Sequence, residues 1–510
     1  MIVLYNPLST TPGKQPLPLS LLSLAAVLET RPHAHGRTHE PWVLVDGNLV
    51  SNPGKEIIER LSQESALSTA SASLTRRRQA LLAVTVMPGP QLTQAVDVCR
   101  RVRTVLPHVP IVWGGYFPTQ HADTVLQSPF VDFVVRSQGE RALLKLIDAL
   151  ESGGALGDIE GLSWKAGAHA VHNPVGQPIP LDDLPDLPYH RVDMGRYLHT
   201  NYLGRRTIAH NSSFGCPFAC NFCAVVAMSN RRWLAQSPER MERVLRHLAE
   251  TYRVDAVQMH DMDFFISEAR TAEFCERIAD LRLSWWALGR VDTLMQYSDS
   301  TWQKMARSGL KMVFSGAESS TNETLAAMNK GGRSSATLAL DLAQRMAHYD
   351  IVPEFSFVLG CPPDPELDVE RTFAFIRRVK RVNPATEIVL YTYTPVPHEG
   401  QLYADAQRKG FSFPQTLDEW ASPEWQQLSM RRGDGIPWMD AAVTRRIRNF
   451  ERVVNAFYPT VTDRRLTRWH RIALKAASGW RYALQWYGAP YELRALHRVI
   501  RYQRPETTGF

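Results

Sequence analysis

The sequence predicts an α/β protein with three parts: an N-terminal doubly wound parallel sheet, a central partial (β/α)6 barrel of the TIM type, and a C-terminal helical region. Three observations support this fold class. The 510 residues exceed one ordinary domain of about 100–200 residues. Strand-like and helix-like runs alternate in two series, as in βαβ units. A segment rich in Pro and Gly separates the series, and the last part contains helix-like runs rich in Trp, Tyr and Arg.

The first series occupies residues 1–150. Short apolar runs alternate there with runs of helical spacing, which predicts one parallel sheet covered by helices. The strands are expected at Ile2–Tyr5, Trp42–Asp46, Ala80–Met87, Ile111–Trp113 and Val131–Val135. The helices are expected at Leu19–Leu28, Glu56–Leu67, Leu92–Leu106 and Arg141–Leu150.

Residues 151–194 contain Gly153-Gly154, Gly161 and a cluster of prolines, which predicts a linker with one small hairpin. The second series occupies residues 195–410, with helices such as Pro238–Thr251 and Ser334–His348. Its strands are expected at Arg206–Asn211, Ala256–His260, Leu283–Leu288, Met312–Ser315, Glu354–Leu359 and Glu387–Tyr393. Residues at the C-terminal ends of such strands face the site of a barrel. Residues 411–510 form the third part.

Composition narrows the class of protein. Hydrophobic residues make up 44% and charged residues 21%, as in globular chains. The longest apolar stretch, Leu17–Leu28, is shorter than the ~20 residues that span a bilayer. The start of the chain lacks the basic region of a signal peptide, so we expect a cytoplasmic protein. Six cysteines are too few for a disulfide scaffold.

Positive charge is concentrated at the C-terminal end. Residues 431–510 hold 16 Lys and Arg against 6 Asp and Glu, whereas the net charge of the whole chain is +7. Tryptophans and tyrosines are interleaved with these arginines. Three interpretations stay open: a surface for single-stranded nucleic acid, a helix lying on anionic lipid as a peripheral membrane contact, and core aromatics beside extended arginines. We expect no nucleic-acid partner, because no RNA-binding module is recognisable.

Three cysteines stand close together in a loop after a strand-like run. Cys216, Cys220 and Cys223 have CxxxCxxC spacing. Three thiolates on a tight loop can bind three irons of a [4Fe–4S] cluster and leave the fourth iron open to a non-protein ligand. The alternative is a structural zinc site, which needs a fourth Cys or His. The other cysteines are distant in sequence, and His210 lies on the preceding strand.

The cysteine loop resembles the signature of radical S-adenosylmethionine enzymes, with Phe222 directly before the last cysteine. Further matches follow the expected strands in order, at His260–Phe265, Arg290–Asp292, Ser315–Ser319, Met328–Gly331 and Gly360–Pro363. The resemblance covers residues 195–410. It implies that the three cysteines bind the cluster and that S-adenosylmethionine chelates the open iron. It also implies an electron donor such as flavodoxin or ferredoxin.

The resemblance assigns candidate residues to S-adenosylmethionine. Ser315, Gly316 and Glu318 are candidates for the ribose or methionine moiety. Arg290 is a candidate for the carboxylate, since a guanidinium fork suits that group. The alternative for Arg290 and Glu318 is a mutual ion pair at the barrel end.

The N-terminal part resembles flavodoxin-like cobalamin-binding domains. Asp46-Gly47-Asn48 stands where those domains carry a loop with a cobalt-ligating His, so Asn48 departs from the pattern and is a poor ligand beside an imidazole. Either cobalamin binds without this ligand, or the fold persists without the cofactor. The candidates for contact with cobalamin are Asn48, Thr85, Met87, Gly89, Gly114, Gly115, Tyr116 and Glu140. Glu140 has an alternative as a carboxylate at a helix start.

Together the resemblances imply a cobalamin-dependent radical S-adenosylmethionine enzyme. The group includes methylases of unactivated carbon and the anaerobic magnesium-protoporphyrin ester cyclase. We expect C-methylation of a hydrophobic, lipid-like or natural-product small molecule, with radical oxidation or cyclisation as the alternative. A non-enzymatic cobalamin-binding regulator is disfavoured by the intact cysteine loop. Asp261, Asp263, Tyr391 and Tyr393 are candidate catalytic residues at strand ends, and each has a structural alternative.

Overall fold

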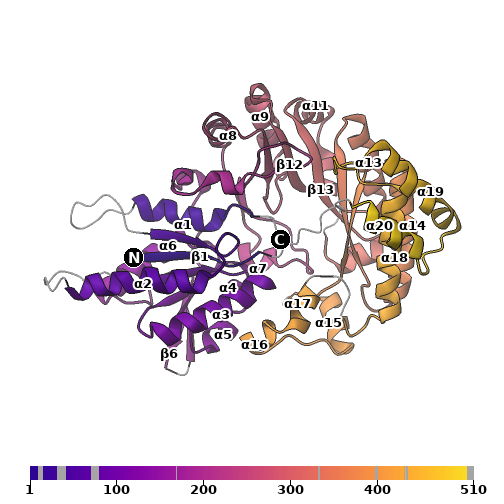
Figure 1. Ribbon diagram of the computed structural model, residues 1–510. Coiled ribbons are helices and arrows are strands. Elements are labelled where there is room, and N and C mark those ends of the chain that lie inside the picture. Colours follow the sequence, from indigo (N-terminus) through magenta and orange to yellow (C-terminus); the bar gives the residue numbers. More distant parts are fainter. Residues whose placement is uncertain are drawn as a thin grey trace.

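The computed structural model describes residues 1–9, 15–30, 42–70, 80–167, 169–330, 334–396, 400–429, 431 and 435–501, without the side chains of 64–70. A sheet domain and a barrel domain lie side by side, and the last helices of the chain cover the outer flank of the barrel (Figure 1). Within these residues, no helix is long and apolar enough to cross a membrane.

The first domain is built on a seven-stranded sheet in the order β2-β1-β3-β4-β5-β6-β7. The first five strands are parallel: β1 (Ile2–Asn6), β2 (Trp42–Asp46), β3 (Leu81–Thr85), β4 (Ile111–Gly114) and β5 (Phe133–Val135). β6 (Leu162–Ala166) and β7 (His169–His172) are antiparallel. The hairpin predicted within 151–194 is therefore present, and it extends this sheet.

Helices cover both faces of this sheet. Alternate residues of β1 point to opposite faces: Ile2 and Leu4 join one core, and Val3 and Tyr5 join another. The first core is shared with α1 (Leu19–Thr30) and α6 (Glu140–Ser152). The second is shared with α2 (Pro53–Ala70), α3 (Pro90–Val105), α4 (Tyr116–Gln120) and α5 (Ala122–Gln127). The predicted doubly wound sheet is confirmed.

The barrel contains six parallel strands in chain order, which confirms the predicted (β/α)6 architecture. They are β8 (Thr207–His210), β11 (Ala256–Met259), β12 (Ser284–Arg290), β13 (Leu310–Glu318), β14 (Val352–Leu359) and β15 (Glu387–Thr392). The connecting helices are α8 (Pro238–Tyr252), α9 (Glu268–Ile278), α10 (Val291–Gln296), α11 (Asp299–Arg307), α12 (Asn322–Ala327), α13 (Ala336–His348) and α14 (Pro365–Val382). β8 and β15 form the open edges.

The sequence did not predict the elements around the cysteine loop. β9 (Ser213–Gly215) pairs with β10 (Trp233–Ala235), and α7 (Val225–Ser229) lies between them. They place the loop between the two domains, because α7 contacts α4 of the first domain.

The C-terminal part is helical, as predicted. It contains α15 (Gln401–Arg408), α16 (Leu417–Trp420), α17 (Pro423–Ser429), α18 (Ala441–Phe457), α19 (Arg468–Leu484) and α20 (Tyr491–Val499). α16 returns to the first domain, where Trp420 joins the core behind α3 and α4. The C-terminal aromatics divide into a buried and an exposed group. Trp420, Trp438, Tyr482 and Tyr487 are buried, whereas Trp469, Trp480, Trp486 and Tyr491 are exposed.

Candidate functional site

The cysteine loop is anchored at its start by Asp261. This carboxylate accepts hydrogen bonds from the Ser212 hydroxyl at 2.8 Å and from the Ser212 backbone N–H at 3.2 Å. Asp261 is fully buried at the end of β11. Both carboxylate oxygens accept hydrogen bonds from Ser212, and these bonds hold the start of the loop against the end of β11.

The far side of the loop is held by the turn after α12. The Asn221 backbone N–H donates to the Met328 carbonyl at 3.0 Å, and its side chain donates to the Ala327 carbonyl at 2.7 Å. In return, the Asn329 side chain donates to the Ala219 carbonyl at 2.8 Å. This explains the motif beginning at Met328, whose last residue, Gly331, lies outside the described residues. Phe222 packs against the barrel core.

The three thiols are neighbours whose surroundings oppose ionisation. Burial raises the pKa of Cys216 to about 12 and that of Cys223 to about 11. Burial also raises the pKa of Cys220, against the effect of Lys330 and Arg290. Thiolates are the metal-binding form, so a bound cation must supply the missing stabilisation.

The donor set fits an iron–sulfur cube better than a single ion. Among the described residues, no group of three or more His, Cys, Asp or Glu is arranged to hold one metal ion. A cube instead takes one thiolate per iron. The zinc alternative needs a fourth ligand, and among the described residues His210, the nearest histidine, forms no metal-holding group with the cysteines; its Nε2 is hydrogen-bonded to the Gln236 side chain at 3.1 Å.

Arg290 lies at the end of β12, directly over the cysteine loop. Its guanidinium forms a two-pronged pair with Asp292, at 2.9 and 2.8 Å, and a third nitrogen lies 3.3 Å from Cys220 Sγ. It also stacks on the Phe218 ring at 3.8 Å and donates to the Lys330 carbonyl. The alternative of an Arg290–Glu318 pair is therefore wrong: the partner of Arg290 is Asp292, and that of Glu318 is Lys330.

The end of β13 forms a compact polar cluster. Lys330 Nζ lies 2.8 Å from Glu318 Oε1 and 2.6 Å from the Gly316 carbonyl oxygen. A Cβ on Gly316 would lie 1.9 Å from Glu318 Oε1, so a side chain there would displace the pair. Nearby on the strand, Ser315 Oγ is buried without a hydrogen-bond partner. An unsatisfied buried hydroxyl suits a polar ligand at this strand end.

Asp263 and the two tyrosines differ in environment. Burial raises the pKa of Asp263 to about 7, and its Oδ2 has no hydrogen-bond partner. The charges of Arg290, Asp292 and Lys330 all act on this carboxyl. Tyr393 is buried beside Trp438, with ring centroids 5.9 Å apart, and burial raises its pKa. Tyr391 is half-buried on β15. Asp263 is therefore the catalytic candidate most suited to proton transfer.

Glycines end the strands of the first domain where it faces the barrel. Gly115 has φ +97°, and a Cβ there would lie 3.1 Å from Thr85 Oγ1. Gly89 also has positive φ, and the nearby Met87 N–H donates to the Gln91 side chain at 3.0 Å. Tyr116 follows Gly115 and lies close enough to Cys223 and Arg431 for their charges to act on its pKa, which burial raises. The glycine loops and the cysteine loop therefore face each other.

Asn48 is held within its own turn. Its side chain donates to Asp46 Oδ1 at 2.8 Å and accepts from the Ser9 N–H at 2.7 Å. Asp46 in turn accepts from the Tyr197 hydroxyl at 3.0 Å. The amide that replaces the expected His is thus engaged in holding the loop.

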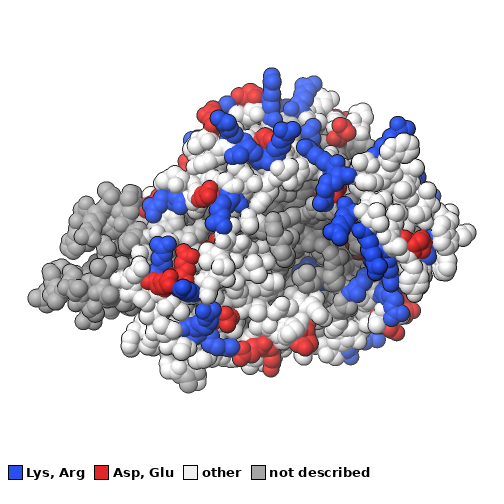
Figure 2. Space-filling model, viewed as in Figure 1, with Lys and Arg blue, Asp and Glu red and all other residues white. Residues whose placement is uncertain are grey.

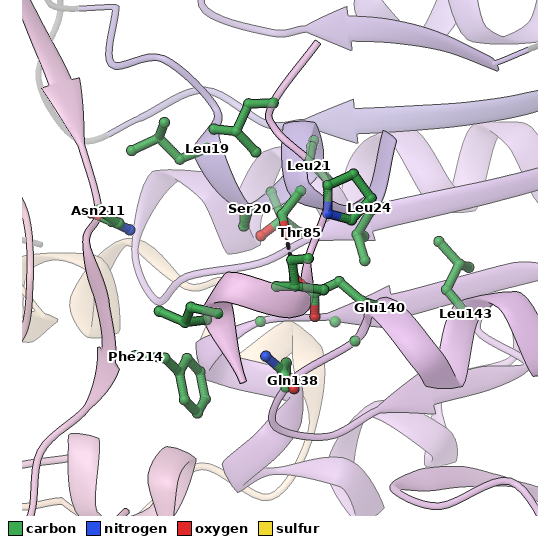
Figure 3. Close-up of a pocket in the computed structure, with 18 of the residues that line it drawn as sticks. Leu19, Ser20, Leu21, Leu24, Thr85, Gln138, Glu140, Leu143, Asn211 and Phe214 are labelled. Carbon is green, nitrogen blue, oxygen red and sulfur yellow. Dashed lines mark hydrogen bonds between the residues drawn. The ribbon is translucent and has the colours of Figure 1, made fainter. Parts of the chain in front are cut away.

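A cavity of about 260 Å³ lies between the two domains. Figure 3 shows Leu24, Glu140 and Leu143 of the first domain at the right and Asn211 and Phe214, from the segment that follows β8, at the left. Thr85, Gly114 and Gly115 also line it. Glu140 Oε1 accepts from the Ser23 hydroxyl at 2.5 Å, whereas Oε2 is buried without a partner. Burial raises the Glu140 pKa. The cavity thus combines glycine-lined walls with an unsatisfied carboxyl oxygen, which suits a ligand that forms hydrogen bonds close to the backbone.

Comparison with known proteins agrees with this geometry. A family model described as "B12 binding domain" matches residues 18–147, and one described as "Radical SAM superfamily" matches residues 210–376. The chain is a radical S-adenosylmethionine protein with a B12-binding domain. The cofactor set predicted from the resemblance is thereby confirmed at the level of the two domains.

Relatives of this B12-binding radical S-adenosylmethionine protein include methylases and a cyclase. The anaerobic magnesium-protoporphyrin IX monomethyl ester cyclase of Synechocystis is 29% identical over 47% of this chain and 48% of its own. An uncharacterized methyltransferase of Pyrococcus horikoshii is 26% identical over 64% of this chain and 70% of its own. The match thus spans about half the length of the cyclase.

Among solved structures, the radical S-adenosylmethionine methyltransferase TsrM of Kitasatospora setae, with tryptophan and a S-adenosylmethionine analogue bound, has a TM-score of 0.59. It is 18% identical, and the match covers 76% of this chain and 73% of TsrM, so it supports the fold.

The sequence alone did not identify Asp292, Lys330, Asn221 or Ser23 as site residues. Asp292 and Lys330 lie in motifs that the resemblance had marked, and that signal could have found them.

Proposed function

We propose that this protein C-methylates an unactivated carbon of a hydrophobic or natural-product small molecule. The supporting observation is the approach of α4, which carries the glycine loop of the B12-binding domain, to α7, which follows the cysteine loop. Groups held by these loops would be neighbours, as methyl transfer to a substrate between them requires. The proposed partners are the small molecule and an electron donor such as flavodoxin or ferredoxin, and the proposed location is the cytoplasm.

The cofactors would supply the radical and the methyl group. In this proposal Cys216, Cys220 and Cys223 hold the iron–sulfur cluster. Arg290, Ser315, Gly316 and Glu318 would orient S-adenosylmethionine, and Lys330 Nζ, 2.8 Å from Glu318 Oε1, would hold the Glu318 carboxyl group in place.

The cobalamin assignment rests on the glycine-lined cavity. Thr85, Gly114 and Gly115 line the cavity where the ligand would approach the backbone, and Glu140 Oε2, which has no partner, would be available to hydrogen-bond it. Gly89, Met87 and Tyr116 border the same face of the domain. Since Asn48 is bonded to Asp46 and Ser9, we propose that it serves the loop and offers no ligand to cobalt.

The second candidate function is radical oxidation or cyclisation without methyl transfer, favoured by the relation to a cyclase. Asp263 serves either reaction, because a carboxyl with a pKa of about 7 can accept or release a proton near neutrality. Tyr391 and Tyr393 stay weaker candidates for contact with substrate.

Anaerobic reconstitution with iron, sulfide and cobalamin tests the proposal. After addition of S-adenosylmethionine and a reductant, the methylase is expected to bind cobalamin and to form both 5′-deoxyadenosine and S-adenosylhomocysteine, measured by mass spectrometry. Cys216→Ala is the control that should abolish 5′-deoxyadenosine. Formation of 5′-deoxyadenosine alone, without bound cobalamin, would refute the methylase and support the oxidative alternative.

A further inference from the structure

Helix α19 is apolar on two opposite faces. Its inner face buries Leu474, Ser478 and Tyr482. Its outer face exposes Trp469 by 76%, Ile472 by 47%, Trp480 by 43% and Leu484 by 71%. The outer residues recur at three- and four-residue intervals and, with Ala473, Ala476 and Ala483, form one stripe along the helix. A helix of this kind in water leaves apolar surface that a partner normally covers.

The stripe continues onto α20 and the turn before it. Trp486 is 53% exposed, Tyr491 69% and Val499 82%. The Trp480 and Trp486 rings lie 5.2 Å apart, and the Arg481 guanidinium lies 4.6 and 4.7 Å from their centres. The exposed apolar residues of α19, α20 and this turn therefore form one continuous surface, which we call the α19–α20 face. Figure 2 shows mostly uncharged surface over α19 at the outer edge of the molecule, bordered by blue side chains.

The charge around this face has one sign. Residues 464–501 contain nine Lys and Arg but a single acidic residue, Glu492. Glu492 is already paired with the buried Arg481, at 2.9 Å through Oε2. Arg468, Lys475 and Arg498 are exposed beside the apolar stripe. The face therefore presents tryptophans and leucine bordered by uncompensated cations.

We propose that the α19–α20 face docks peripherally onto an anionic phospholipid bilayer. Exposed tryptophans and leucines enter the boundary between headgroups and acyl chains, while Arg and Lys at the rim contact lipid phosphates. A second copy of the chain is a poorer occupant, because a symmetric contact would bring two strongly basic faces together. The helices lie on the flank of the barrel away from the B12-binding domain (Figure 1), so docking leaves the interdomain cavity uncovered.

This surface extends the proposed function toward its substrate. A catalyst held at a bilayer meets molecules that partition into lipid, so docking favours a lipid-like substrate over a water-soluble one. That extension rests on the proposed function, whereas membrane docking itself rests only on the α19–α20 face.

Vesicle flotation of the full chain tests the docking separately from catalysis, because it requires neither cofactors nor substrate. Binding is expected to vesicles of phosphatidylcholine with phosphatidylglycerol, and to fall with added salt and with removal of the anionic lipid. The variant Arg468→Gln/Lys475→Gln/Arg498→Gln is expected to weaken binding about a hundredfold, at about fivefold per cation. Trp469→Gln/Leu484→Gln is expected to weaken it at least about tenfold.

Two matched controls change exposed residues elsewhere. Lys55→Gln/Lys409→Gln removes charge from other elements, and Val105→Gln removes an apolar side chain that is 54% exposed on α3. Both should bind as the unmodified chain does. The proposal is overturned if anionic vesicles do not bind, or if both surface variants bind as well as the controls. A dimer abolished by Trp469→Gln, without vesicle binding, would also overturn it and assign the face to a second copy.

Discussion

His121 should make the contact between the B12-binding domain and α16 sensitive to acid. It lies at the junction of α4 and α5, with its ring centre 4.8 Å from Phe117, 4.5 Å from Trp420 and 6.1 Å from Phe413. Burial among these rings lowers its pKa from 6.5 to about 4. The unfolded chain therefore takes up a proton below about 6.5, and the folded chain does so only near 4. Stability is expected to fall as the pH decreases through this window.

The expected magnitude follows from the two pKa values. At about pH 5, proton binding to His121 stabilises the unfolded state relative to the folded state by about 2 kcal/mol. At pH 7 this difference is close to zero, because neither state binds the proton to a large extent. His121→Phe keeps an aromatic ring in the cluster and removes the titration. Between pH 7 and about pH 5, the unmodified protein should therefore lose about 2 kcal/mol more stability than this variant.

Urea denaturation at the two pH values, followed by circular dichroism and tryptophan fluorescence, measures this difference. His169→Gln, an exposed position on β7, is the matched control and should retain the acid sensitivity of the unmodified protein. Equal loss of stability in the unmodified protein and in His121→Phe would refute the reasoning, because the acid sensitivity would then arise elsewhere.

Three further predictions concern the site. Cys216→Ala should lose the iron and visible absorbance of the reconstituted protein with unchanged circular dichroism; full iron content would remove this thiol from the cluster site. Gly115→Val should lower cobalamin affinity about tenfold in equilibrium dialysis, because φ is +97° and Thr85 Oγ1 lies 3.1 Å from the added Cβ; Gly157→Val, with open space around it, should bind normally, and equal affinities would contradict the assignment. Arg290→Met should destabilise the fold by about 3–5 kcal/mol, since it leaves buried Asp292 without its cation. The added change Asp292→Asn should recover much of this loss in urea denaturation, and no recovery would show that the pair is not the cause.

Local patterns in the sequence were sufficient to predict the order of strands and helices in both domains. Apolar runs ending in Gly or a polar residue located the strands, because a buried parallel strand requires both features. The same logic located the cysteine loop at the end of β8. Helices α4 and α7 escaped prediction because they are single turns without helical periodicity. Their contact nevertheless joins the two candidate cofactor loops.

Side-chain pairing was less predictable than strand position. Arg290 and Glu318 follow neighbouring strands, which suggested a mutual pair. Asp292 sits two residues beyond Arg290 at the start of α10, and Lys330 reaches back from the turn after α12. Which residues form an ion pair therefore depends on the path of the loop after each strand, and the sequence does not show this path. The exposure of α19 was also difficult to predict from the sequence, because a helix with two apolar faces has the same composition as a buried helix.

The β6–β7 hairpin protects one edge of the first sheet from pairing with strands of other chains. Without it, β5 would be the outermost strand, and its apolar sequence Phe133–Val135 would offer unpaired N–H and C=O groups to other chains. The hairpin moves that edge to β7, whose four residues begin and end with histidine and are followed by Pro174 two residues later. A short polar edge near a proline is a poor template for strand addition. The segment between the two domains therefore protects the protein against aggregation through its sheet.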